Sequence, residues 1–154
     1  MRTLAIAFCA LAAVAPARAQ APATAPATYL SEAELMATLK TAALTAPDMH
    51  TAPVKIADHY RINIVRRTKP QGAITHADGT EVHHIIDGAA TFVTGGTIVR
   101  PAGAGRGGTA TIEGGQSRRV AKGDVILVPA GTPHWYRDLV GTITYLEVRF
   151  DVPK

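Results

Sequence analysis

The stretch GDVILVPAGTPHWYRD, residues 123–138, contains the features that decide the fold. Its four consecutive apolar residues, 125–128, predict a buried β-strand, which the following Pro-Ala-Gly turn ends. After the turn comes His134, and Tyr136 shares its face because side chains alternate along an extended chain. His134 is therefore a candidate metal ligand, and Tyr136 is a candidate proton donor or pocket hydroxyl.

A second stretch, THADGTEVHHIIDG at residues 75–88, gathers three histidines and one glutamate. Alternation along the predicted strand puts Glu81 and His83 on one face and turns His84 to the other. His76 lies in the preceding turn, where the chain can fold back and bring the imidazole near Glu81. A carboxylate with two or three imidazoles is a ligand set that Zn, Fe, Mn or Ni prefers.

The chain from Val54 onward consists of short β-rich segments that Gly- and Pro-containing turns separate. The segments are VKIADHYRINIVRRT, EVHHIID, ATFVTGGTIVR, TATIEG, SRRVA, DVILVPA and TITYLEVRF. This spacing, with no further helical pattern, is typical of an all-β sandwich or barrel. The glycine-rich residues 101–108 predict a mobile loop. They do not predict a phosphate site, because the Lys-Ser/Thr ending and the following helix are missing.

Residues 1–19 have the pattern of a secretory signal peptide. Arg2 gives the positive start, the apolar run 4–14 is too short to span a bilayer, and Ala-Arg-Ala at 17–19 is a small-x-small cleavage site. The mature chain is therefore expected in the periplasm or outside the cell, with no membrane attachment after cleavage.

The rest of the chain divides into a linker and one domain. Residues 20–29 are rich in Ala, Pro and Thr, which predicts a flexible linker. Ser31 and Glu34 then form a predicted capping box at the start of one short helix. With 154 residues in the whole chain and a hydrophobic fraction of 47%, residues 30–154 are expected to form a single domain with its own core.

Charge and cysteine content exclude several classes of function. Cleavage would remove two of the 16 basic residues, which leaves 14 basic and 12 acidic residues in the mature chain. This near balance of charge gives no support for nucleic-acid binding. Cleavage would also remove Cys9, the single cysteine. The mature chain would then have no disulfide, no thiolate ligand and no cysteine nucleophile, so its stability would come from packing or from a metal.

The two histidine-bearing stretches resemble the cupin superfamily, whose motifs are written G(X)5HXH(X)3-4E(X)6G and G(X)5PXG(X)2H(X)3N. The second motif is matched at nearly every position, by Gly123, Pro129, Gly131 and His134, with Asp138 where the family has Asn. Several offsets must agree at once for this match, which makes it specific for the fold.

The first motif is matched in part, by His76, Glu81 and Gly88 at the family's spacings. Ile74 stands where the family has its first histidine, and the leading glycine is also missing. The resemblance covers residues 55–150. It indicates the fold more strongly than any one activity, because one fold hosts many functions.

The resemblance implies an all-β fold, the cupin-type double-stranded β-helix or jelly-roll barrel, here with one short N-terminal helix. The barrel would hold one divalent metal ion, such as Zn, Mn, Ni or Fe, through His76, Glu81 and His134. Three interpretations of Ile74 stay open: this set of three is complete, His83 supplies the missing nitrogen, or the site no longer binds a metal. His83 can also act as a hydrogen-bond partner or as a substrate contact.

The leading hypothesis is an exported metal-dependent enzyme that acts on a small organic molecule inside the barrel. The ion would polarise an oxygen atom or activate water or dioxygen, while Glu81, His83 or Tyr136 moves a proton. Lyase, isomerase, cyclase and dioxygenase activities all stay open. Metal acquisition outside the cytoplasm favours Zn or Cu over Fe(II), and so favours redox-neutral chemistry.

The alternative is a non-catalytic barrel that binds a small ligand and has a degenerate metal site. Ile74 favours this alternative, whereas the gathering of so many titratable groups favours the enzyme. A third possibility is a purely structural partner protein, because exposed strand edges of an open jelly roll could pair into a homodimer. Such a homodimer is also compatible with the other two interpretations. The arginines at positions 61, 66 and 149 could guide an anionic substrate, but solvated strand positions are the expectation for them.

Overall fold

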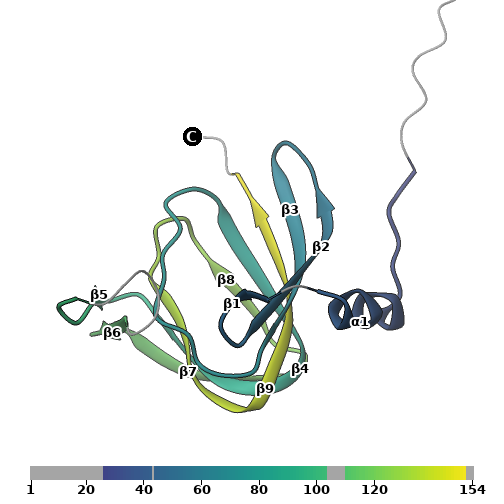
Figure 1. Cartoon of the computed structure of the whole chain (residues 1–154). Coiled ribbons are helices and arrows are strands. Elements are labelled where there is room, and N and C mark those ends of the chain that lie inside the picture. The colour runs from purple at the N-terminus through teal and green to yellow at the C-terminus, as the bar shows by residue number, and fades with distance from the viewer. Residues whose placement is uncertain (1–25, 43, 104–109, 152–154) are drawn as a thin grey trace, which may run out of the picture.

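The computed structural model describes residues 26–42, 44–103 and 110–151. The predicted signal peptide, residues 20–25 of the predicted linker and most of the glycine-rich loop lie outside these ranges. The elements are α1 (Glu32–Lys40), β1 (Leu44–Ala46), β2 (Met49–Ile56), β3 (Tyr60–Arg67), β4 (Thr80–Thr94), β5 (Thr97–Val99), β6 (Thr111–Glu113), β7 (Gln116–Ala121), β8 (Val125–Val128) and β9 (His134–Phe150). The all-β prediction with one short helix is confirmed (Figure 1).

Two long strands, β4 and β9, form the frame of the barrel. They pair antiparallel from Thr80 opposite Phe150 to Thr94 opposite His134. Near Phe150, β9 pairs with β3 and β4 pairs with β8, while near Thr94 β4 pairs with β7. In the described part of the chain, these strands form one seven-stranded sheet with β1 and β2, and β5 and β6 form a separate two-stranded sheet. The prediction of separate short segments was wrong here, because β4 runs without a break from Thr80 to Thr94 and β9 from His134 to Phe150.

Gly88 lies at the bend of β4, where the pairing with β9 shifts register. Its φ is +82°, a conformation that disfavours residues with a side chain. A Cβ atom at this position would overlap the carbonyl oxygen of Thr142 on β9. Glycine therefore lets the two strands stay paired while they bend around the barrel.

The core has two parts, one inside the barrel and one under the helix. The interior cluster consists of Val65, Ile85, Ala90, Phe92, Val120, Val128, Tyr136, Ile143 and Tyr145. The outer cluster packs α1 against β2 and β3 through Leu39, Ala52 and Ile64. The predicted capping box of Ser31 and Glu34 is present at the start of α1. Among the described residues, no helix is long and apolar enough to span a bilayer.

Strand β8 is buried on one face only, so the prediction of a fully buried strand was wrong. Val125 and Leu127 are 65% and 63% exposed, whereas Val128 is 2% exposed. Because β8 belongs to an antiparallel sheet, one face packs on the barrel interior and the other faces solvent.

Candidate metal centre

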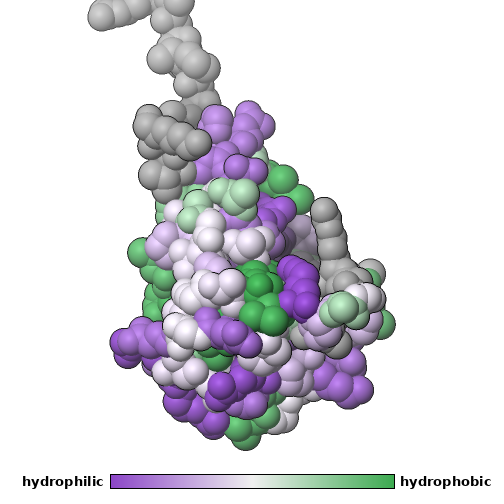
Figure 2. All heavy atoms as spheres, turned by 90° about the vertical axis from the view of Figure 1, so that its left-hand side faces the viewer, coloured by the Kyte–Doolittle hydropathy of each residue, from purple (hydrophilic) through white to green (hydrophobic). Residues whose placement is uncertain are grey.

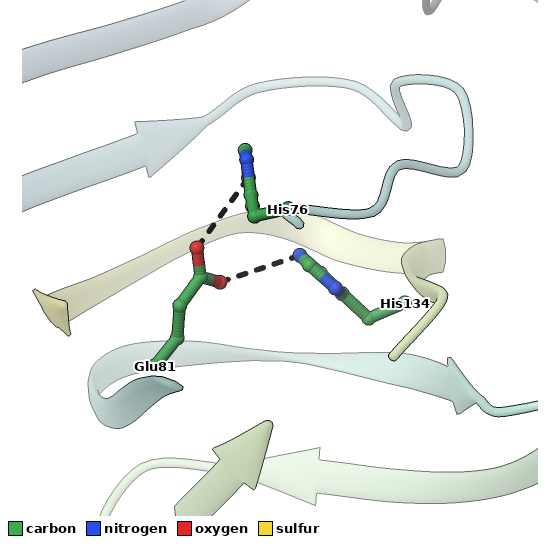
Figure 3. Close-up of side chains that lie close together, drawn as sticks. All are labelled: His76, Glu81 and His134. Atoms are coloured by element: carbon green, nitrogen blue, oxygen red, sulfur yellow. Dashed lines mark ion pairs between the residues drawn. The ribbon is translucent and has the colours of Figure 1, made fainter. Parts of the chain in front are cut away.

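His76 and His134 come from chain segments far apart in sequence that pair locally. Ile74 and His134 exchange both backbone hydrogen bonds, at 3.0 and 2.9 Å, which brings the residues before β4 beside the start of β9. The amide of Gly131 donates to the carbonyl oxygen of His76 at 2.7 Å, so the Pro-Ala-Gly turn holds that loop. Figure 3 shows the two imidazoles pointing toward Glu81, which rises from β4.

The two imidazoles approach different oxygens of one carboxylate. Nε2 of His76 lies 3.4 Å from Oε1 of Glu81, and Nε2 of His134 lies 3.4 Å from Oε2. Both separations exceed the usual hydrogen-bond length of about 2.7–3.2 Å. Two ligands with bonds of 2.0–2.1 Å to a tetrahedral ion lie roughly 3.4 Å apart, so the spacing suits an ion between them.

A backbone hydrogen bond fixes the tautomer of His134. Its Nδ1 lies 3.0 Å from the carbonyl oxygen of Thr132, which can only accept, so Nδ1 carries the hydrogen. Burial lowers the pKa of His134 to about 4, and the ring is therefore neutral at pH 7. Its Nε2 lone pair then faces the carboxylate of Glu81, an arrangement that a cation between them would stabilise.

Glu81 is 1% exposed and is surrounded by cationic and hydrogen-bonding groups. Arg149 forms an ion pair with Oε1 through Nη2. Burial alone would raise the pKa of Glu81, but the hydrogen bond with His83 and the interactions with His134, which is charged at low pH, and with Arg149 and His76 lower it to about 2. The carboxylate is therefore ionised at neutral pH and available as a ligand.

His83 lies on the same inward face as Glu81, whereas His84 is exposed on the opposite face, as predicted. Nε2 of His83 lies 3.2 Å from Oε2 of Glu81, and Nδ1 lies 3.0 Å from the hydroxyl of Tyr136. The Tyr136 ring stacks against the His83 ring, with centroids 5.8 Å apart. His83 thus has a fixed orientation with Nε2 directed at the carboxylate.

Tyr136 is 2% exposed and lies behind His83. Burial raises the pKa of its hydroxyl well above 10, so the phenol keeps its proton at neutral pH. Its hydroxyl contacts His83 and not Glu81. Any proton that Tyr136 moves would pass through His83, so the predicted role as a proton donor becomes indirect.

Arg149 and Glu147 lie beside Glu81 and His83, a placement that the sequence interpretation did not predict for Arg149, and it did not single out Glu147 at all. Arg149 was expected to be solvated, which was wrong: its side chain is 15% exposed and bonds to Glu81. Register explains this, because Arg149 pairs with Glu81, and Glu147 with His83, between β9 and β4. Of the other two arginines, Arg61 is exposed as expected, while the Arg66 Nε donates to the Thr144 hydroxyl at 3.1 Å.

Alternation within TITYLEVRF puts Tyr145, Glu147 and Arg149 on one face, but only the register with β4 shows that this face meets Glu81 and His83. Among the described residues, two groups of three donors have ligand atoms within 4.8 Å of one another. One consists of His76, Glu81 and His134, and the other of Glu81, His83 and Glu147. The predicted ligands are therefore brought together, and their roles stay predictions.

No family model and no curated protein matches the sequence. Solved structures do match. KdgF from Halomonas sp. is 14% identical over 73% of this chain and 88% of its own, with a TM-score of 0.51. A putative mannose-6-phosphate isomerase from Ralstonia eutropha is 16% identical over 73% and 93%, with a TM-score of 0.51.

A predicted oxalate decarboxylase from Thermotoga maritima is 14% identical over 68% of this chain and 81% of its own, with a TM-score of 0.50. These likenesses concern the fold, and the matching structures are cupins. They agree with the second motif at residues 123–138. The chain therefore has a cupin-type jelly-roll fold.

Proposed function

We propose that this protein is an exported metal-dependent enzyme that acts on a small organic molecule inside the barrel. The observation that carries the proposal is the convergence of two imidazole nitrogens on separate oxygens of the buried Glu81, each at 3.4 Å. A neutral imidazole lone pair that faces a buried carboxylate oxygen is a costly arrangement unless a cation lies between the two. It is the arrangement expected of a metal site.

His76, Glu81 and His134 would hold the ion. When bound, the ion would polarise a substrate oxygen or lower the pKa of a water molecule. The side chain of His76 is 32% exposed, whereas those of Glu81 and His134 are 2% and 4% exposed. A substrate would therefore approach from the side of His76, the most exposed of the three side chains.

His83 is the best-placed group to move a proton. Its Nε2 points into the ligand cluster, and its Nδ1 is held by the neutral hydroxyl of Tyr136. The Tyr136 hydroxyl can hydrogen-bond to Nδ1 in either tautomer of His83, because a hydroxyl both donates and accepts. His83 can therefore accept or give a proton at Nε2 while Tyr136 keeps its ring in place.

Two cavities of a size that suits a small molecule each have one lining residue beside the centre, Phe92 in one and Arg149 in the other. One of about 460 Å³ includes Phe92, Arg118 and Ile126 in its lining. The Phe92 ring lies 6.1 and 6.2 Å from the rings of His83 and His134. Another of about 370 Å³ has Arg149 in its wall. In Figure 2, apolar surface lies in the middle of the face on the side of β5–β7, beside strongly hydrophilic side chains. Both volumes fall within the range of small-molecule sites.

The second candidate function is a non-catalytic barrel that binds a small ligand. The contact of Arg149 with Glu81 favours it, because a guanidinium already compensates the carboxylate that the ion would need. Ile74, in place of a motif histidine, also favours it.

One experiment separates the two functions. The mature chain, loaded with Zn²⁺, Mn²⁺, Ni²⁺ or Fe²⁺ in turn, is incubated with an extract of small metabolites, and each compound is followed by mass spectrometry. An enzyme consumes a compound and forms a product only with the ion and only when Glu81 is intact. Glu81→Gln is the inactive variant, and Glu113→Gln on β6 is the matched control. A compound that binds but remains unchanged would support the ligand-binding barrel instead.

A further inference from the structure

A second group of ligand atoms lies directly beside the proposed metal centre and shares Glu81 with it. His83 and Glu147 complete this group, on neighbouring strands β4 and β9 that place them opposite each other. We call His76 and His134 the outer donors, and His83 and Glu147 the inner donors. The inference that follows rests on the proposed function.

The inner donors have the orientation that metal ligands need. Nδ1 of His83 is engaged by the Tyr136 hydroxyl, and Nε2 is left for Glu81 or an ion, as in metal-bound histidines. Glu147 accepts a hydrogen bond at Oε1 from the Asn63 side-chain amide at 3.2 Å. Asn63 therefore fixes the carboxylate of Glu147, which has one oxygen within 4.8 Å of the ligand atoms of Glu81 and His83.

The charge balance around Glu81 favours binding of the ion by Glu147 as well. Arg149 already lies against Glu81, so a divalent ion bound there meets a neighbouring positive charge. Glu147 supplies the second negative charge. With both carboxylates and Arg149, one divalent ion leaves a net charge of about +1, whereas two ions would leave about +3 in a mostly buried cluster, which is strongly unfavourable.

We propose that the cluster holds one divalent ion with two adjacent positions that share Glu81. In the outer position the ion is bound by His76 and His134, and in the inner position by His83 and Glu147. Glu147, which neither cupin motif marks, is then a metal ligand. The mixture of carboxylates and imidazoles suits Mn²⁺, Fe²⁺ or Zn²⁺.

Two deletion variants and the intact chain test the proposal. The outer-deleted variant carries His76→Ala and His134→Ala, and the inner-deleted variant carries His83→Ala and Glu147→Gln. Zn²⁺ and Mn²⁺ binding is measured by calorimetry and by elemental analysis, with circular dichroism to establish folding. His84→Ala, on the exposed face of β4, is the matched control. We expect one ion per chain in all four proteins, with affinity at least about tenfold lower in both deletion variants.

Several outcomes would overturn the two-position proposal. A folded outer-deleted variant that binds no ion would leave only the outer position, with the proposed function intact. Two ions in the intact chain would contradict the shared single ion. If the outer-deleted variant fails to fold, the single variant Glu147→Gln tests the proposal instead. An unchanged affinity of this variant for Zn²⁺ and Mn²⁺ overturns the proposal, and an affinity at least about tenfold lower supports it. An intact chain that binds no ion would remove the proposed function together with this inference.

Discussion

The hydroxyl of Tyr136 holds His83 from inside the barrel, and its loss should be measurable. Tyr136→Phe would leave the buried Nδ1 of His83 without its partner at 3.0 Å. We expect the free energy of unfolding to fall by about 1–3 kcal/mol, which urea denaturation would measure. Tyr60→Phe, at a residue that is 43% exposed, is the control and should change it by less than about 0.5 kcal/mol. Equal effects of the two changes would refute the role of this hydrogen bond.

Buried His134 should make the stability of the metal-free protein depend on pH. Burial lowers its pKa from 6.5 to about 4, so between these values the unfolded chain binds a proton that the folded chain does not. Stability from this group is therefore present above pH 6.5 and is lost as the pH falls toward 4.

The measurement is the free energy of unfolding from pH 7 to pH 4 without metal. His134→Gln should flatten the slope in this window, whereas His84→Gln, at an exposed position, should leave it unchanged. If His134→Gln keeps the slope of the wild-type protein, another group causes it.

At the level of elements, the bend of β4 depends on Gly88. A Cβ there would overlap the Thr142 carbonyl oxygen, in addition to the cost of a positive φ. We expect Gly88→Ala to cost more than about 3 kcal/mol, or to prevent folding. Gly141→Ala is the matched control, since its φ is +70° but a Cβ meets nothing within 4 Å. It should cost about 1–2 kcal/mol in denaturation experiments. Similar losses at the two positions would show that close packing at the bend is unimportant.

Strand alternation predicted which residues of β4 face inward, because that pattern is local to one strand. It correctly put Glu81 and His83 on one face and His84 on the other. The pattern could not predict that β4 and β9 pair along their whole length, since pairing depends on turns and packing far away in sequence. Arg149 and Glu147 were missed for this reason: their neighbours are set by the register between the two strands.

For the whole molecule, motif spacing predicted the barrel. The missing motif histidine left the set of metal ligands undecided. Ile74 supplies no ligand, but its backbone pairs with that of His134 and so places the preceding segment beside β9. Three-dimensional contacts were needed to find the second group of donors.

Export is a prediction about the whole chain. We expect cleavage after Ala19, so that the mature protein begins at Gln20. Expression with the native N-terminus in a bacterium, followed by fractionation and mass measurement of the intact protein, would test it. A full-length protein retained in the cytoplasm would contradict it.

The predicted homodimer also stays a prediction. Light scattering on the purified mature protein would give its mass in solution, and a mass equal to one chain across the concentration range would refute it.

The central claim is that Glu81 and its surrounding donors bind a divalent ion. The most direct test is elemental analysis of the mature chain after loading with Zn²⁺, Mn²⁺, Ni²⁺ or Fe²⁺ and exhaustive dialysis. Because Glu81 belongs to both donor groups, the wild-type protein should retain about one ion per chain, and folded Glu81→Gln should retain none, whereas Glu113→Gln should match the wild type. A wild-type chain that retains no ion, or a Glu81→Gln variant that retains as much as the wild type, would contradict the claim.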